Sequence, residues 1–279
     1  MIVSRTELER LLIEDTPFGD LTSETLSLGR SAGEMRFVAR GAMVAALVEE
    51  AAGLIEIAGG EVSLFCTAGA ALRPREPILS ARGPATALLR AWKTAQTLIE
   101  IWSGVATGAR AIVEAARGAS GEAVVACTRK TAPGTRAFAL AAIKAGGAIA
   151  HRAGLSETIL LFPEHRVFLD GVALSETARR VRRAAPEKKL VIEVVTVEDA
   201  LAAAEAGFDV IQTEKFPPER VAELARLLPQ RAPRPVIAAA GGVNAGNARA
   251  YVEAGADVLV TSAPYLAPPC DVAVTIAPA

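Results

Sequence analysis

The second half of the chain alternates short apolar segments with helical ones, and this alternation restricts the fold more than any other feature. The apolar segments have the length and composition of buried strands, and they are residues 123–127, 158–162, 190–194, 209–213, 235–239 and 257–261. Residues 205–210 are repeated in similar form at 253–258, and each copy reads as a helix end, a glycine stop and the next strand. Repeated β-α units with short connections require a parallel sheet, most economically a barrel.

The first hundred residues follow a different pattern. Ser4 and Glu7 form an S-x-x-E capping box ahead of a helix whose apolar face starts at Leu8. The next expected elements are a strand, a helix, a strand and a strand, at residues 35–40, 44–58, 61–66 and 76–81. This order predicts a small α+β layer and not an alternating barrel.

A long helical tract is expected to join the two parts. It opens after Gly83 and Pro84, covers residues 85–102, is interrupted at Ser103 and Gly104, and resumes over 107–117. We therefore expect an α/β protein in which this tract joins an N-terminal α+β layer to a C-terminal α/β barrel.

Composition excludes several classes of partner. The chain has 279 residues and a formal net charge of −1, so no overall field attracts it to nucleic acid or membranes. Aromatic residues are only 4%, too few for stacking platforms that bind single strands. Three distant cysteines form neither a zinc motif nor a disulfide framework, and the charged start lacks a signal-peptide pattern. We expect a cytoplasmic protein, with Cys127 a buried small side chain and not a nucleophile.

Charged residues and glycines follow the predicted strands. Active sites of β/α barrels lie at the carboxyl ends of the strands, and the residues found there are Arg129, Lys130, Glu193, Glu214, Gly241, Gly242 and Ser262. Several such residues at one edge predict a shared cavity. This inference depends only on the strand pattern.

The loop at residues 128–136 gathers three cations, Arg129, Lys130 and Arg136, between a strand and a helix. Like charges this close repel unless an anion joins them, and free N–H groups at the following helix also favour an anion. A solvated basic loop is the alternative interpretation. His151 and Arg152, which follow a glycine turn, form a second candidate group for anion binding.

Gly241 and Gly242 precede a helical segment that has Asn244 near its start. Backbone without side chains lets N–H groups approach a phosphate closely, and late loops are the usual phosphate site of barrels. Ordinary turn chemistry is the alternative explanation for a Gly-Gly pair.

Glu193 and Glu214 come from neighbouring strand ends and could hold Mg²⁺, bind sugar hydroxyls or stabilise a developing cation. Each could instead pair with a lysine such as Lys215. The acidic turn at residues 15–20 could also bind a metal, although a structural or subunit-edge role is preferred. Cations, a glycine corner and two carboxylates together suit a phosphorylated sugar that loses pyrophosphate with Mg²⁺ present.

The chain resembles the quinolinate phosphoribosyltransferases over nearly its whole length. The residues that carry this resemblance are the T-R-K-T-A-P-G-T-R run at 128–136 and segments 14–22, 83–84, 103–107, 151–155 and 239–244. The resemblance implies an N-terminal α/β sandwich domain at residues 1–107 followed by an incomplete α/β barrel at residues 108–267. It also implies a last strand near 272–276 that returns to the first domain over residues 268–279. It also implies a homodimer with shared sites, a catalytic role for Lys130, and Ser262 and Ala263 in the substrate site.

Four positions depart from the family pattern. Lys93 stands where the family has an arginine that reaches the dicarboxylate across the dimer, and Phe162 stands where it has a lysine. Glu214 and Lys215 replace an aspartate-asparagine pair, and Ala240 replaces a serine. Lysine cannot copy the bidentate geometry of arginine. This pattern resembles the ModD branch, whose members are pyrophosphorylase-like and are associated with molybdenum uptake.

Two functions remain open at this point. The first is a phosphoribosyl- or pentosyltransferase that acts on a small anionic acceptor, either quinolinate or another acid. The second is a non-catalytic or regulatory protein of the same fold that binds a ligand such as an oxyanion. Phe162 and Lys215 motivate the second hypothesis because they replace polar residues that the chemistry uses.

Overall fold

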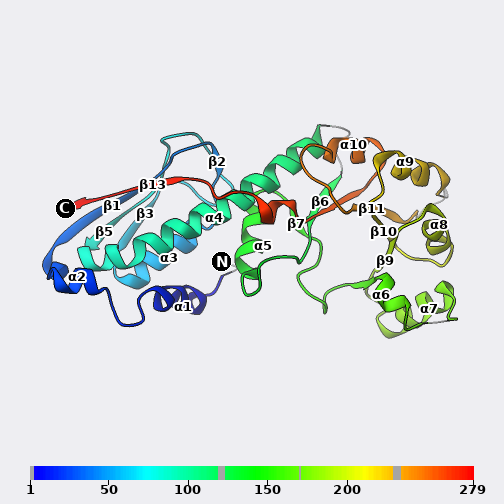
Figure 1. Ribbon diagram of the computed structural model, residues 1–279, viewed down its shortest axis with the longest axis horizontal. Helices are drawn as coiled ribbons and strands as arrows, with labels where there is room; N and C mark the ends of the chain where they lie inside the picture. Colours follow the sequence, from blue (N-terminus) through cyan, green and yellow to red (C-terminus); the bar gives the residue numbers. More distant parts are fainter. Residues whose placement is uncertain (1–2, 119–122, 170, 229–233) are drawn as a thin grey trace. The chain divides into compact units, whose positions relative to one another are not determined.

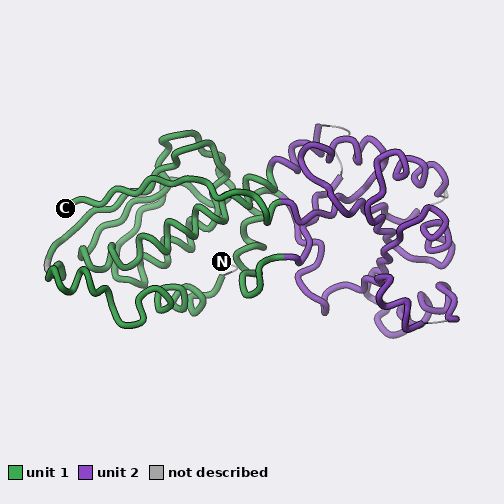
Figure 2. The backbone as a smooth tube through the Cα atoms, in the orientation of Figure 1, with its two compact units in different colours: residues 1–110, 131–147, 264–279 green, residues 111–130, 148–263 purple. Residues whose placement is uncertain are grey.

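The chain forms two compact units in the computed structural model, which describes residues 3–118, 123–169, 171–228 and 234–279. Unit 1 contains Met1–Arg110, Thr131–Gly147 and Pro264–Ala279, and unit 2 contains Ala111–Lys130 and Ala148–Ala263 (Figure 2). The division after Arg110 falls close to the expected boundary at residue 107. Residues 131–147, which were expected in the second domain, group with unit 1 instead.

Unit 1 is built on an antiparallel sheet with strand order β13-β1-β5-β3. These strands are β1 (Ala32–Ala39), β3 (Glu61–Leu64), β5 (Pro77–Pro84) and β13 (Val272–Pro278), and a separate pair joins β2 (Met43–Val44) to β4 (Ala71–Leu72). The helices of unit 1 include α1 (Arg5–Asp15), α2 (Leu21–Thr25), α3 (Val48–Ala58), the first part of α4 (Ala85–Arg117) and α5 (Arg136–Ala145). Helices α3 and α4 run alongside the sheet strands (Figure 1).

The core of unit 1 lies between this sheet and its helices. Met35 and Phe37 of β1 are fully buried, and they belong to one apolar cluster with Leu54 of α3 and Leu88 of α4. Alternate residues of β1 supply this buried face, as the period of two in a half-buried strand requires. Strand β13 pairs antiparallel with β1 from Ala39↔Val272 to Gly33↔Pro278, so the last strand does return to the first sheet.

The expected interruption of the long helix is wrong, because α4 is a single helix of 33 residues. Ser103 is fully buried and its hydroxyl accepts a hydrogen bond from the backbone N–H of Ala46 at 3.0 Å. A Cβ at Gly104 would overlap the carbonyl group of Pro268. Glycine therefore stands at this position because another segment passes close to the helix, and not because the helix ends there.

Unit 2 contains a seven-stranded parallel sheet with strand order β7-β6-β12-β11-β10-β9-β8. The strands are β6 (Val124–Cys127), β7 (Ile149–Ala150), β8 (Ile159–Leu161), β9 (Leu190–Val194), β10 (Val210–Glu214), β11 (Val236–Ala240) and β12 (Val258–Thr261). The sheet curves into an arc and its edge strands β7 and β8 do not pair, so the barrel is incomplete (Figure 2).

Helices cover the outer side of this arc (Figure 1). They are α7 (Leu174–Ala184), α8 (Val197–Glu205), α9 (Pro218–Leu227) and α10 (Ala248–Glu253), and a short helix α6 (Pro163–Arg166) follows β8. The six predicted strands of the second half all form, within about one residue of the expected bounds. The α/β fold class, a sandwich with an incomplete barrel, is confirmed.

The structure differs from the sequence-based expectations in other local details as well. Val44 ends strand β2, and α3 begins at Val48, four residues later than expected, after Leu47 in a left-handed conformation (φ 55°). Strand β7 was not predicted, because two residues are too few for a period to be recognised. Helix α2 was also missed. Its N-cap is Asp20, whose carboxylate accepts hydrogen bonds from the backbone N–H groups of Thr22 and Ser23.

No helix in the described residues is both long and apolar enough to span a lipid bilayer.

Candidate active site

A cavity of about 600 Å³ opens at the carboxyl ends of the strands of unit 2. All seven strands contribute to its lining, either with their last residues or with the residues that follow them. The predicted site residues among them are Arg129, Lys130, His151, Arg152, Glu193, Glu214, Gly241, Gly242 and Ser262. This volume lies in the range of pockets that bind metabolite-sized ligands.

Arg152 is the most buried cation of this cavity, with 5% of its surface exposed. Burial lowers the pKa of its guanidinium, and the nearby charge of Arg129 lowers this pKa further. No ion pair joins Arg152 to a carboxylate of the described residues, and its guanidinium carbon lies over the Phe162 ring. A buried cation without a counter-charge favours an anionic ligand, because the ligand supplies the missing charge.

Arg129 and Lys130 are exposed residues at the start of the loop after β6. The backbone N–H of Lys130 donates to the Thr128 hydroxyl at 3.3 Å, and the N–H of Thr128 donates to the Thr261 carbonyl at 2.8 Å. These bonds fix the loop to the end of β12, so both cations remain at the cavity. The backbone N–H of His151 donates to the Cys127 carbonyl at 2.8 Å, which holds this residue in place. Burial lowers the pKa of its imidazole, which favours the neutral ring.

Glu193 and Glu214 are the carboxylates of the cavity and lie on the neighbouring parallel strands β9 and β10. Burial raises the pKa of Glu193 and the charge of Glu214 raises it further, whereas a hydrogen bond from Gln212 lowers it. Glu214 forms a long ion pair of 3.9 Å with Lys215, a side chain that is 80% exposed. The alternative role of these carboxylates, ion pairing with a lysine, is thus only weakly supported for Glu214. Among the described residues, no lysine forms an ion pair with Glu193.

The two glycines of the loop after β11 occupy their positions for different structural reasons. Gly241 has φ 86°, and a Cβ there would lie 2.8 Å from the Lys215 backbone nitrogen and 3.0 Å from Glu214 Oε1. Gly242 has φ 90°, and open space surrounds the position of its missing Cβ. Gly241 is thus required by the turn that carries Glu214. Gly242 leaves its backbone accessible to a ligand.

Four predicted site residues do not line this cavity. The Asn244 side chain is occupied within its own loop, where Nδ2 donates to the Gly242 carbonyl and Oδ1 accepts from the Gly246 N–H. Ala263 directs its N–H to the Thr261 hydroxyl at 3.0 Å. Arg136 begins α5 and Lys93 lies on α4, both in unit 1.

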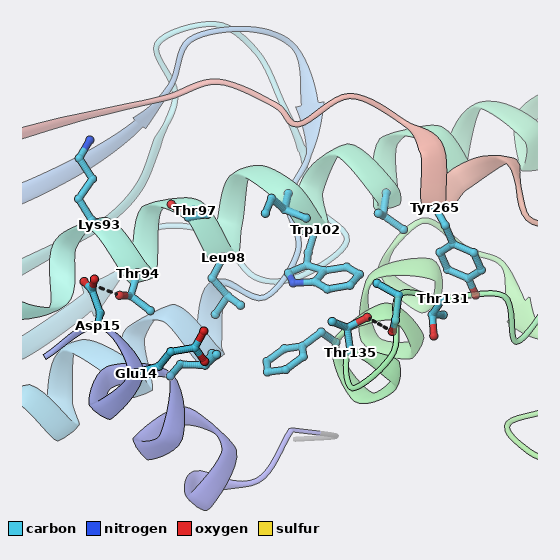
Figure 3. Close-up of a pocket in the computed structure, with 15 residues that line it drawn as sticks. Glu14, Asp15, Lys93, Thr94, Thr97, Leu98, Trp102, Thr131, Thr135 and Tyr265 are labelled. Atoms are coloured by element: carbon cyan, nitrogen blue, oxygen red, sulfur yellow. Dashed lines mark hydrogen bonds between the residues drawn. The ribbon is translucent and has the colours of Figure 1, made fainter. Parts of the chain in front are cut away.

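Lys93 lines a separate cavity of about 680 Å³ in unit 1, which is mainly apolar. Its amine donates to Gln96 Oε1 at 3.2 Å and lies 4.1 Å from the Trp92 ring centre. The Lys93 side chain points away from Glu14 and Trp102, which border the same cavity (Figure 3).

Burial raises the pKa of the thiols of Cys66, Cys127 and Cys270, so none of them is activated as a nucleophile. Cys127 is 1% exposed and burial raises the pKa of its thiol to about 12, so it stays protonated at neutral pH. Asp20 is engaged as the cap of α2. Within the described ranges, no group of three or more His, Cys, Asp or Glu side chains could hold a metal ion by itself. Two carboxylates would therefore share any Mg²⁺ with oxygen atoms of a ligand.

Gln212, a polar residue that lines the cavity and is only 4% exposed, was not among the predicted site residues. A period of two would have found it, because Gln212 precedes Glu214 by two residues and faces the same side of β10.

Comparisons with known proteins agree with this architecture. Residues 105–275 match the family described as Quinolinate phosphoribosyl transferase, C-terminal domain, and residues 20–103 match its N-terminal domain. The chain belongs to the quinolinate phosphoribosyltransferase family.

Within the family, the chain is similar to ModD proteins. It is 48% identical to ModD of Rhodobacter capsulatus over 248 residues, which cover 88% of this chain and 95% of that protein. It is 33% identical to the nicotinate-nucleotide pyrophosphorylase [carboxylating] of Mycobacterium leprae, over 93% of this chain and 92% of that protein. The crystal structure of NadC from Streptococcus pyogenes has the same fold, with a TM-score of 0.89 and 23% identity over 98% of this chain and 96% of that chain.

Proposed function

We propose that this protein transfers phosphoribose from phosphoribosyl pyrophosphate to a small anionic acceptor and releases pyrophosphate. The observation that carries the proposal is the buried Arg152, which has no carboxylate partner in the described part of the chain and shares its cavity with Arg129 and Lys130. The family relationship supports the same chemistry, because the Mycobacterium leprae relative is named a nicotinate-nucleotide pyrophosphorylase.

The proposed roles follow from charge. Arg129, Lys130 and Arg152 bind the anionic groups of the substrates, and the accessible backbone N–H of Gly242 receives a phosphate. Glu193 faces the sugar carbon, where its negative charge stabilises the cation that develops as the bond to pyrophosphate breaks. Lys130 lies close enough to Glu193 to influence its pKa, and we assign it to the same catalytic centre.

Mg²⁺ fits this donor set as a proposed cofactor. Glu193 and Glu214 would hold it from adjacent strands, and carboxylate oxygens are the ligands that Mg²⁺ prefers. When bound, the ion would neutralise negative charge on the leaving pyrophosphate.

We also propose a homodimer. Lys93 lies in unit 1, and a second copy of the chain would bring its own Lys93 to the acceptor. Arg136, at the start of α5, also lies in unit 1. It stays a candidate phosphate-binding residue that a second copy of the chain would bring to the site. Gel filtration with light scattering tests the dimer, and a monomer at micromolar concentration would contradict it.

Calorimetry with phosphoribosyl pyrophosphate and Mg²⁺ tests the proposed function. We expect binding at micromolar to submillimolar concentration, and turnover assays with quinolinate and related acids then identify the acceptor. Absence of binding at millimolar ligand would overturn the proposal. Binding of the sugar phosphate with no reaction of quinolinate would indicate a different acceptor.

A second candidate is a binding protein for an oxyanion such as molybdate, with no catalytic activity. Lys215 favours it, since its ammonium group lies 3.9 Å from Glu214 and reduces the charge available for Mg²⁺. Phe162 favours it also, as an apolar side chain within the cavity. Formation of nucleotide and CO₂ from quinolinate would eliminate this candidate.

A further inference from the structure

Gln212 occupies an unusual position for a polar side chain. It lies in the middle of β10, a central strand of the parallel sheet, and is 4% exposed. Its register partner on β9 is Glu193, so the two side chains point to the same side of the sheet at adjacent positions. Both line the cavity of unit 2. Such a strand interior normally carries apolar side chains.

The two ends of the Gln212 amide have different surroundings. Its Nε2 donates a hydrogen bond to Glu193 Oε2 at 2.6 Å. Its Oε1 is buried and accepts no hydrogen bond from the described residues. A buried acceptor without a partner lowers stability, and exchanging the amide gives no relief because an N–H group would then be unpaired in the same place.

Gln212 therefore costs stability at a site where an apolar side chain would fit. Small apolar residues surround it on the same face of the sheet: Ala238 is its register partner on β11, and Ala238 clusters with Ala240 and Val260. Methionine has a similar length and no hydrogen-bonding requirement, so packing alone gives no reason for glutamine. Unsatisfied groups of this kind are retained where they serve a site.

Glutamine at position 212 provides a hydrogen-bond donor whose position is fixed by the sheet. Glu193 carries two carboxylate oxygens, and the bond from Gln212 holds one of them. The charge of Glu214 raises the pKa of Glu193, so the two carboxylates repel each other when both are ionised. A carboxylate fixed at one oxygen presents the other oxygen in a constant direction, as residues that support metal ligands do.

We propose that Gln212 is a positioning residue, which orients the Glu193 carboxylate toward the Mg²⁺-bound diphosphate of phosphoribosyl pyrophosphate. This inference rests on the proposed function. It assigns to Gln212 no contact with the reacting atoms, and it predicts that the contribution of Gln212 to binding depends on Mg²⁺.

The test compares Gln212→Met with wild-type protein. Calorimetry measures the affinity for phosphoribosyl pyrophosphate with Mg²⁺ and the affinity for inorganic pyrophosphate without it, and thermal unfolding measures stability. We expect the Mg²⁺-dependent affinity to fall at least fivefold, the Mg²⁺-free affinity to stay within twofold, and the melting temperature to stay equal or rise. Gln212→Leu is a second apolar variant in case methionine does not pack.

Thr213→Val is the matched control. Thr213 is fully buried on the same strand, faces the opposite side and is absent from the cavity lining. We expect the affinities of this variant to stay within twofold of wild type.

The outcomes distinguish failure of the positioning role from failure of the proposed function. Equal Mg²⁺-dependent affinity in Gln212→Met and wild type would overturn the positioning role and leave the proposed function intact. Equal losses with and without Mg²⁺ would also overturn it, because they indicate general distortion. Failure of the wild-type protein to bind phosphoribosyl pyrophosphate with Mg²⁺ would overturn the proposed function and this inference with it.

Discussion

The guanidinium carbon of Arg152 lies 5.5 Å from the centre of the Phe162 ring. A buried cation and an aromatic ring thus form one wall of the cavity in unit 2. Such a contact stabilises by about 0.5–2 kcal/mol, more when it is desolvated. The ring also shields Arg152 from water, which strengthens the attraction of its guanidinium for an anion. A lysine at position 162 would make this wall of the cavity more polar.

Replacing Phe162 by lysine should increase the affinity of the cavity for multiply charged anions. Phe162→Lys adds a positive charge beside Arg152, so we expect pyrophosphate to bind at least threefold more tightly at low ionic strength, with the gain lost as salt increases. Calorimetry measures both effects. Phe168→Lys adds the same charge at a side chain that is 87% exposed and outside the cavity lining. Equal gains in both variants would contradict a local effect.

Removing the Arg129 side chain should weaken binding of phosphoribosyl pyrophosphate at least tenfold. Arg129→Ala takes away a charge-assisted contact, and such contacts contribute about 1.5–3 kcal/mol. Arg183→Ala is the control, since Arg183 is an exposed cation of α7 outside this cavity. Calorimetry at one fixed salt concentration compares the two variants. An unchanged affinity in Arg129→Ala would remove Arg129 from the site.

The two adjacent glycines should differ in their tolerance of alanine. Gly241→Ala combines a positive φ with a collision against the Lys215 backbone, and we expect a loss of roughly 2–4 kcal/mol. Gly242→Ala meets open space, so only the left-handed strain of about 1–2 kcal/mol remains. Urea unfolding measures both values. A loss in Gly242→Ala as large as that in Gly241→Ala would show that the contact with Lys215 is unimportant.

Two glycines inside helices should also differ. Gly104→Ala in α4 should destabilise the protein by roughly 1–3 kcal/mol, because the new methyl group overlaps the backbone of Pro268. Gly53→Ala in α3 meets only a Leu8 methyl group at 3.1 Å, and alanine favours the helix by about 1 kcal/mol. We expect Gly53→Ala to be neutral or stabilising. Unfolding free energies that show the reverse order would contradict the close approach at Gly104.

The buried Glu50 should make stability decrease as pH rises. It is 6% exposed, and burial raises the pKa of its carboxyl above the value of about 4.3 in an unfolded chain. The folded state then binds more protons than the unfolded state between these two values, so stability falls as pH increases through that window. Glu50→Gln cannot ionise, and we expect it to be more stable than wild type at pH 8.

Measurements of unfolding free energy for both proteins at pH 4 and pH 8 check this sign. The advantage of Glu50→Gln should be larger at pH 8. A variant that is less stable than wild type at pH 8 would mean that the ionised carboxylate is stabilised by its surroundings.

The sequence by itself determined the strands of unit 2 and the edge of the sheet that carries the site. Apolar runs and glycine stops are local properties of the chain, so they predicted six parallel strands without knowledge of their neighbours. Because the carboxyl ends of parallel strands meet at one edge, Arg129, Glu193 and Gly241 could be assigned to one cavity from strand positions alone.

Only the tertiary structure decided the roles of residues whose neighbours are distant in the chain. Gly104 resembled a helix break until Pro268 was found against it, and Asn244 resembled a ligand residue until its own loop occupied its amide. The pairing of Gln212 with Glu193 depends on the register of two strands. Close packing and hydrogen bonds across the fold are not encoded in the local period of the sequence, which is why these residues could be judged only in three dimensions.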